Sequence, residues 1–182
     1  MRRDLIPHPG TPPGPAQAIR VEVERRGAAL SFHFVLGGDV GRIRIPPPAA
    51  PERAEDLWRH TCFEAFLRAP GEQAYLEFNF SPSGEWAAYR FEGYRAGRTE
   101  LDIPAPSNGG YHGGDRLVSF VSLAGLPSNR FWQIGLSAVV EDLDGRLSYW
   151  ALAHAPGDPD FHHPDGFALE FPPAGSHPSP RA

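Results

Sequence analysis

Residues 57–91 read LWRHTCFEAFLRAPGEQAYLEFNFSPSGEWAAYRF. This stretch decides the fold because apolar and polar residues alternate along it in three runs. Alternation with a period of two is typical of β-strands with one buried face. Two short segments that contain Pro and Gly, 69–74 and 82–85, separate the runs. We therefore expect three consecutive antiparallel strands.

The first connection predicts which residues of the first two strands face one another. A hairpin closed by residues 69–74 places Glu64 opposite Asn79 and Phe66 opposite Glu77. Successive side chains of a strand point to opposite faces, so one face of this hairpin is polar. The other face is expected to be apolar core.

The second connection extends both faces to the third strand. If residues 82–85 close a hairpin with Ser81 opposite Trp86, then Glu77 lies opposite Arg90, near enough for a cross-strand ion pair. The polar face then carries Glu64, Glu77, Asn79, Trp86 and Arg90. The apolar face carries Phe63, Ala65, Leu67, Leu76, Phe78, Phe80, Ala87, Tyr89 and Phe91.

The chemistry of this polar face is typical of a binding groove for a small polar ligand. Carboxylates accept hydrogen bonds, Arg90 donates them, and Asn79 does both. The indole of Trp86 offers an apolar face on which the C–H groups of a sugar stack. The alternative is a plain solvated sheet face on which Glu77 and Arg90 simply pair.

Strand patterns continue on both sides of the central block, whereas residues 92–116 form a long excursion that contains Gly and Pro. Nine or ten strands without a long helix predict an all-β fold, an antiparallel two-sheet β-sandwich. The folded domain is expected over residues 18–171, between an N-terminal tail, 1–17, and a C-terminal tail, 172–182. Further strands are expected near 19–23, 30–36, 40–45, 117–123, 131–141, 147–154 and 167–171.

Composition excludes several classes of partner. The chain of 182 residues has a formal net charge of −5 and scattered arginines, so we expect no nucleic-acid binding, which needs a basic patch. No segment approaches the roughly 18 apolar residues of a membrane span, and no signal peptide is evident. A single cysteine, Cys62, allows no internal disulfide. These features favour a cytoplasmic protein.

The central block also carries a resemblance to a known family. The patterns LW-x-x-TCFE-A-F and Y-L-E-F-N-F-S-P-S-G-x-W-A-x-Y-x-F resemble the DOMON-like domains related to family 9 carbohydrate-binding modules, and the segment 160–167, DFHHPDGF, resembles their C-terminal end. The resemblance implies a jelly-roll or immunoglobulin-like β-sandwich with a groove for ligands that range from sugars to haem. Sugar-binding relatives clamp a saccharide between two tryptophans and contain structural calcium. The tryptophans here are Trp58, Trp86, Trp132 and Trp150.

The histidines and the methionine of the chain bear on whether it binds haem or a metal. A Met/His haem site is excluded because the only methionine is Met1. A His/His site would need two of His60, His154, His162 and His163, and haem is not expected. Carboxylates and imidazoles also gather in one loop and form a weak metal site, for which calcium is an option: His154, Asp158, Asp160, His162 and His163. The alternative is that these side chains cap turns.

The sequence thus favours a non-catalytic small-molecule-binding module, of the carbohydrate-binding kind. One alternative is a glycoside-processing enzyme in which Glu64 and Glu77 serve as the carboxylate pair. The expected Glu77–Arg90 ion pair opposes this alternative, because it would keep the pKa of Glu77 low. The other alternative is a structural or protein-interaction module whose polar sheet face receives a partner.

Overall fold

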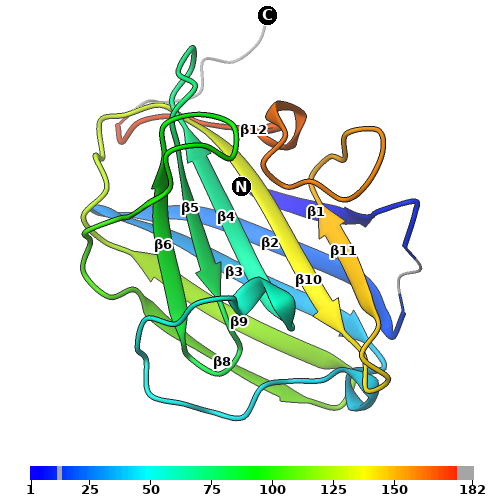
Figure 1. Cartoon of the computed structure of the whole chain (residues 1–182). Coiled ribbons are helices and arrows are strands. Elements are labelled where there is room, and N and C mark those ends of the chain that lie inside the picture. The colour runs from blue at the N-terminus through cyan, green and yellow to red at the C-terminus, as the bar shows by residue number, and fades with distance from the viewer. Residues whose placement is uncertain (12–13, 176–182) are drawn as a thin grey trace, which may run out of the picture.

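The computed structural model describes residues 1–11 and 14–175 and is built from antiparallel strands (Figure 1). Three single 3₁₀ turns interrupt the connections, and no helix of the described residues is long and apolar enough to cross a membrane. The strands are β1 Arg2–Pro7, β2 Ala16–Arg26, β3 Ala29–Gly38, β4 Cys62–Arg68, β5 Tyr75–Phe80, β6 Trp86–Phe91, β7 Thr99–Glu100, β8 Ser107–Gly113, β9 Arg116–Leu123, β10 Trp132–Glu141, β11 Leu147–Ala151 and β12 Leu169–Phe171, and the turns are η1 Val40–Arg42, η2 Leu57–Arg59 and η3 Pro164–Gly166.

All strands belong to one curled sheet, in the order β7-β6-β5-β4-β10-β11-β1-β2-β3-β9-β8, with β12 beside β10. Strand β1 forms the corner. Its first residues pair with β2, from Arg2 opposite Glu22 to Leu5 opposite Ile19, and its last residues pair with β11. The half with β4, β5, β6, β10 and β11 therefore folds over the half with β2, β3, β8 and β9, as Figure 1 shows.

The main core lies between these two halves because each contributes one apolar face. Phe34 of β3 stacks on Phe63 of β4 with ring centroids 4.9 Å apart. Phe32 and Phe80 approach to 6.5 Å across the same interior. Apolar side chains that leave water in this way supply the main driving force for folding.

The all-β, antiparallel prediction is confirmed, but its details change. The sheet is continuous through β1, so two separate sheets are not confirmed, and the described residues form twelve strands where nine or ten were expected. Residues 2–7, expected in a tail, form β1. Residues 40–42 form η1 in place of a strand, and the excursion 92–116 contains β7 and β8. The end of the expected C-terminal tail, 176–182, lies outside the described residues.

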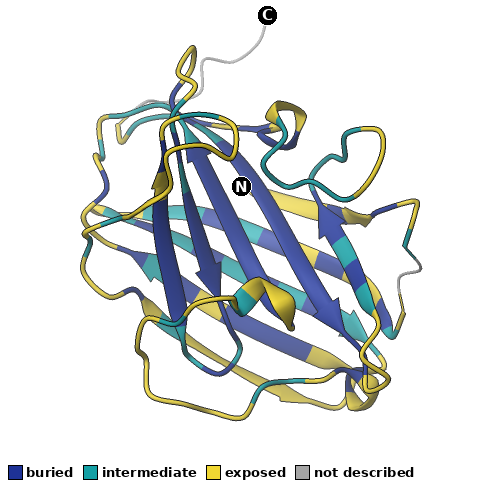
Figure 2. Ribbon diagram, viewed as in Figure 1, coloured by how far each residue is buried: buried dark blue, intermediate teal, exposed yellow. Residues whose placement is uncertain are grey.

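The two halves of the sheet differ in how far their outer faces are buried. Strands β2 and β3 alternate between buried and more exposed residues, whereas β4, β5 and β10 are buried along almost their whole length (Figure 2). Burial on both faces means that other segments of the chain cover the outer face of β4, β5 and β10. The cover includes η3, whose Gly166 carbonyl oxygen lies 3.1 Å from where a Cβ on Gly135 of β10 would stand. A glycine at position 135 permits this close approach.

The register between β5 and β6 differs by one residue from the expected one. Phe80 lies opposite Trp86, and a backbone bond from Ser81 N to Glu85 O, 3.0 Å, closes the hairpin around a three-residue turn. Gly84 has a φ of 103°, which favours glycine. A slip of one residue moves every side chain of a strand to the other face. Trp86 and Ala88 therefore enter the main core, and Ala87, Tyr89 and Phe91 turn to the outer face.

Two tryptophans give a matched test of this register. Trp86 is 4% exposed and Trp58 is 46% exposed. We predict that Trp86→Ala lowers the free energy of unfolding by about 3–5 kcal/mol, the usual cost of truncating a buried aromatic residue. Trp58→Ala is expected to change it by about 0.5 kcal/mol or less. Urea unfolding followed by circular dichroism measures both, and equal effects would contradict the assigned faces.

Candidate functional site

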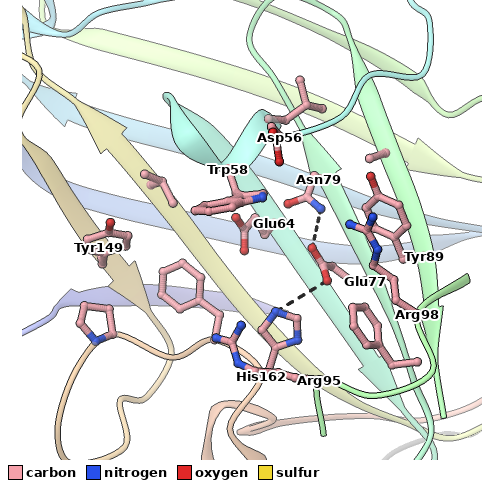
Figure 3. Close-up of a pocket in the computed structure, with 16 residues that line it drawn as sticks. Asp56, Trp58, Glu64, Glu77, Asn79, Tyr89, Arg95, Arg98, Tyr149 and His162 are labelled. Atoms are coloured by element: carbon pink, nitrogen blue, oxygen red, sulfur yellow. Dashed lines mark hydrogen bonds and ion pairs between the residues drawn. The ribbon is translucent and has the colours of Figure 1, made fainter. Parts of the chain in front are cut away.

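A pocket of about 520 Å³ opens on the outer face of β4, β5, β6, β10 and β11. Its floor is the sheet, and its rim is formed by η2 and by the segments 95–98 and 159–162 (Figure 3). The lining residues are Asp56, Leu57, Trp58, Glu64, Glu77, Asn79, Ala87, Tyr89, Phe91, Arg95, Arg98, Val139, Tyr149, Pro159, Phe161 and His162.

A polar row crosses the floor because neighbouring strands present residues to the same face. Glu64 of β4 lies opposite both Ser137 of β10 and Asn79 of β5. Ser137 Oγ donates a hydrogen bond to Glu64 Oε2, 3.2 Å, and Asn79 Nδ2 donates to Glu77 Oε1, 2.6 Å. All four residues are buried, with Glu64 only 3% exposed and Glu77 7% exposed. These hydrogen bonds hold the floor side chains in fixed positions, so the floor is preorganised.

Burial changes the proton affinity of both floor carboxyls. Desolvation, and then repulsion from Glu77, raises the pKa of Glu64 to about 8, against a weaker opposing effect of Ser137 and Arg95. Desolvation also raises the pKa of Glu77, opposed by the hydrogen bond from Asn79 and by the charges of Arg98 and Arg95. At neutral pH we therefore expect Glu64 to hold a proton, and two carboxyls of this kind in one pocket are typical of functional sites.

A chain of polar groups reaches Glu77 from the covering segment. Arg95 N donates to Tyr75 Oη, 3.2 Å, and Tyr75 Oη lies 2.7 Å from His162 Nδ1. The other imidazole nitrogen, Nε2, faces Glu77 Oε2 at 3.8 Å (Figure 3). Burial, and then the charge of Arg95, lowers the pKa of His162 to about 4, so its imidazole is neutral at pH 7. A Tyr75 hydroxyl that donates to Nδ1 would leave the proton of Nε2 directed at Glu77.

The rim combines arginines with aromatic rings. Arg95 Nη2 bonds Asp160 Oδ1 at 2.8 Å, and Arg98 lies 4.7 Å above the ring of Tyr89. Trp58 and Tyr149 border the pocket in Figure 3, and Phe161 also lines it. These rings give the pocket apolar walls above a polar floor, the usual composition of a small-molecule site.

Backbone strain coincides with this rim. In the described residues, the only non-glycine positions with positive φ are Asp56 and Arg95, with φ of 60° and 52°. Both line the pocket. Such conformations cost on the order of 1–3 kcal/mol each and tend to persist at ligand sites. Their shared location is independent support for a site here.

The structure brings together three of the five residues predicted for the groove. Glu64, Glu77 and Asn79 share the floor, and the predicted pairs Glu64/Asn79 and Phe66/Glu77 are confirmed. The Glu77–Arg90 pair is wrong because Tyr89 lies opposite Glu77.

The other two predicted residues lie elsewhere. Trp86 is in the main core, where its Nε1 donates to Pro51 O, 3.3 Å. Arg90 shares the face of Trp86 and is exposed at its end. Both misplacements follow from the one-residue register difference between β5 and β6.

Other lining residues were not assigned to the groove from the sequence. Arg95 lies in the excursion 92–116, whose length alone favours a functional role. The sequence indicates His162 only as a candidate haem or metal ligand, and Trp58 only as one of four tryptophans. Nothing in the local pattern indicates that these segments meet over the sheet, since that contact is tertiary.

The loop predicted as a weak metal site makes other interactions. Asp160 accepts hydrogen bonds from Tyr94 Oη, 2.6 Å, and from Arg95, and His163 Nδ1 accepts from Asp165 N, 3.3 Å, at the start of η3. Asp158 is exposed. In the described part of the chain, no three His, Cys, Asp or Glu side chains gather as a metal site. The turn-capping alternative accounts for Asp160 and His163.

The residues do not fit a bis-histidine haem either, because such a site needs two imidazoles facing one cavity. Of the four candidate histidines, only His162 lines the pocket. His60 Nδ1 lies 2.7 Å from Glu141 Oε2, and His154 Nε2 lies 2.9 Å from Ile6 O. Within residues 1–11 and 14–175, these imidazoles serve separate contacts.

Comparison with known proteins identifies one similar fold. A crystal structure from Bacteroides uniformis ATCC 8492, described as a "putative carbohydrate-binding protein", superposes with a TM-score of 0.68 and 12% sequence identity. The match covers 91% of this chain and 83% of the other. No protein family model matches the chain, and no curated protein matches it. At this identity the likeness shows a shared fold.

The protonated Glu64 predicts a distinctive pH dependence of stability. Its pKa is about 8 in the folded chain against 4.5 for an ordinary glutamate, so the native state binds more protons between these values. The free energy of unfolding should therefore fall with rising pH, by up to about 1.4 kcal/mol per pH unit from this group. We expect Glu64→Gln to remove this slope. The free energy of unfolding of the variant, relative to that of the parent, should therefore rise between pH 5 and pH 8.

Urea unfolding at several pH values measures the difference. Glu170→Gln is the matched control, because Glu170 is exposed on β12. Parallel curves for the parent and Glu64→Gln would contradict the raised pKa.

Proposed function

We propose that this protein binds a small polar ligand, a saccharide, in the pocket over β4, β5 and β6. The observation that carries the proposal is the buried floor of Glu64, Glu77 and Asn79 beneath an aromatic rim. A volume of about 520 Å³ lies within the roughly 300–1,000 Å³ of small-molecule sites. A flat, open sheet face would have opposed binding, and the concavity supports it.

The chemistry of the walls and floor suits sugar hydroxyls. Each hydroxyl both donates and accepts a hydrogen bond, so the carboxyls of Glu64 and Glu77 can each engage one. The rings of Trp58, Tyr89 and Phe161 offer apolar faces for the C–H groups of a sugar ring. Since the floor carboxyls are buried, a hydrogen bond from a polar ligand is electrostatically stronger there than at the surface.

The resemblance to DOMON-like and family 9 carbohydrate-binding domains agrees with this proposal in part. A clamp of two tryptophans would need a second indole at the pocket, but Trp86, Trp132 and Trp150 belong to the main core. Trp58 alone lines the pocket. We therefore propose that Tyr89 or Phe161 provides the ring opposite Trp58. The saccharide site then differs from the two-tryptophan clamp.

Binding can be tested by a glycan array followed by isothermal titration of the strongest hits. We predict that Trp58→Ala and Glu77→Gln each weaken binding by roughly tenfold or more, since a lost stacking ring or a lost charged hydrogen bond costs about 1.4 kcal/mol or more. Tyr111→Ala is the control, because Tyr111 is 61% exposed on β8, outside the pocket. Equal affinity of all four proteins, or no saccharide hit at all, would refute the proposal.

A second candidate function is glycoside hydrolysis. The corrected register removes the arginine expected beside Glu77, and both floor carboxyls have raised pKa values. Glu64 and Glu77 are diagonal neighbours across β4 and β5, which places their backbones about 7–8 Å apart. Hydrolases hold their two carboxyl groups at about 5–9.5 Å, a separation that side chains on neighbouring strands can reach. In this candidate function Glu64 is the general acid and Glu77 is the base or nucleophile.

This second candidate makes its own prediction. If it holds, chromogenic glycosides are hydrolysed at neutral pH, and Glu64→Gln lowers kcat by on the order of 100-fold or more, because a general acid contributes that much. Glu170→Gln should retain full activity. Release of no chromophore from a panel of glycosides between pH 4 and pH 9, by a chain that binds saccharides, would leave binding as the sole role.

A further inference from the structure

The arginines of the pocket form ion pairs, whereas the carboxyls of its floor do not pair with them. Each lining arginine has a carboxylate of its own outside the floor: Arg95 Nη2 bonds Asp160 Oδ1 at 2.8 Å, and Arg98 Nη2 lies 3.6 Å from Glu55 Oε2. Among the described residues, no arginine or histidine nitrogen forms an ion pair with Glu64. The cations of the rim are therefore already engaged, and they act on the floor only from longer range.

In the part of the chain that the structure describes, no arginine pairs with either floor carboxyl, although both carboxyls are buried. Glu64 accepts one hydrogen bond, from the neutral Ser137 hydroxyl, and Glu77 accepts one from the neutral Asn79 amide. His162 approaches Glu77 at 3.8 Å but is neutral at pH 7 because burial lowers its pKa. A buried carboxylate is normally paired with a cation, or neutralised by a proton as Glu64 is at pH 7. Both carboxyls line the pocket, so a cation that enters the pocket can take the place of that proton.

We propose that Glu64 and Glu77 bind an ammonium group of the ligand, and that the ligand is an amino sugar with a free amine. This inference rests on the proposed saccharide function and names its ligand class. One ammonium can donate three hydrogen bonds, enough to engage both carboxyls and the Asn79 carbonyl oxygen. Trp58 and Phe161 line the same pocket, and an aromatic ring attracts a cation over its face.

Binding of an ammonium should release a proton from the floor, because the ligand favours an ionised Glu64. The affinity for a permanent cation is then expected to rise from pH 6 to about pH 8, near the pKa of Glu64, and to level off above it. A neutral sugar gains nothing from this ionisation. The charged and polar groups that face the two carboxyls, and contribute to this profile, are Cys62, Asn79, Ser137, Tyr149, Tyr75, Tyr89, Arg95, Arg98 and His162.

Isothermal titration of the full chain at pH 7 provides the test, with matched ligands. Glucosamine, glucose and N-acetylglucosamine share one ring and differ in the substituent at a single carbon, which is charged only in glucosamine. We expect glucosamine to bind roughly tenfold tighter than the other two, the usual gain from a charged hydrogen bond. Glu64→Gln and Glu77→Gln should abolish this preference, and Glu170→Gln should retain it.

A second pair separates the ammonium from the sugar. Cyclohexylammonium and cyclohexanol have no sugar hydroxyls, and an alkylammonium like that of lysine stays charged to about pH 10. We expect only the ammonium to bind, with affinity that rises between pH 6 and pH 8 and with a heat that depends on the buffer, as proton release requires. This comparison uses the unmodified chain and does not depend on the folding of any variant.

The outcomes are distinguishable. Glucose or N-acetylglucosamine binding as tightly as glucosamine would overturn the ammonium site and leave the saccharide function standing. Cyclohexylammonium binding without any of the three sugars would support the ammonium site and overturn an amino sugar as its ligand. Binding of neither glucosamine nor cyclohexylammonium would overturn the ammonium site, whereas the glycan array decides the saccharide function.

Discussion

The three-residue turn between β5 and β6 is the constraint on which the rest of the structure depends. The bond from Ser81 N to Glu85 O and the positive φ of Gly84 set Phe80 opposite Trp86. That register sends one indole into the main core and turns Tyr89 toward the pocket. A turn longer by one residue would exchange the two faces of β6, place an arginine beside Glu77 and remove an aromatic wall from the site.

A second constraint is that the central strands are buried on both faces. The main core covers one face of β4 and β5, and the segment that holds Phe161, His162 and Phe167 covers part of the other through a small aromatic cluster. Antiparallel sheets commonly leave such a face wet. Here the cover reaches Glu77 through His162 but leaves both Glu64 and Glu77 lining the pocket, so both carboxyls are desolvated yet face a cavity. Desolvation of this kind costs stability unless a ligand supplies the missing partner.

The site therefore works by preorganisation. Ser137 and Asn79 hold the carboxyls in place, and Tyr75 orients His162 toward Glu77. The rim arginines form ion pairs with Asp160 and Glu55 and not with the floor carboxyls. The floor can therefore still bind a hydrogen-bond donor or a cation of the ligand. Saccharide binding, glycoside hydrolysis and recognition of an ammonium all draw on these same two carboxyls. They differ in whether the proton of Glu64 is kept, transferred to a leaving group or released to solvent.

The sequence by itself determined the all-β class, most strand positions, the Glu64/Asn79 register and three of the floor residues, because period-two alternation and a hairpin with a clear turn are local properties. It did not determine the β5–β6 register, because a three-residue and a four-residue turn through the same Ser-Pro-Ser-Gly-Glu segment direct opposite faces of β6 to the core, and the alternation pattern alone does not choose between them. The joining of the halves through β1, the meeting of Trp58, Arg95 and His162 over the sheet, and the raised pKa of Glu64 were decided by tertiary structure alone. Each of these three features depends on contacts between residues far apart in the chain, which local sequence patterns do not encode.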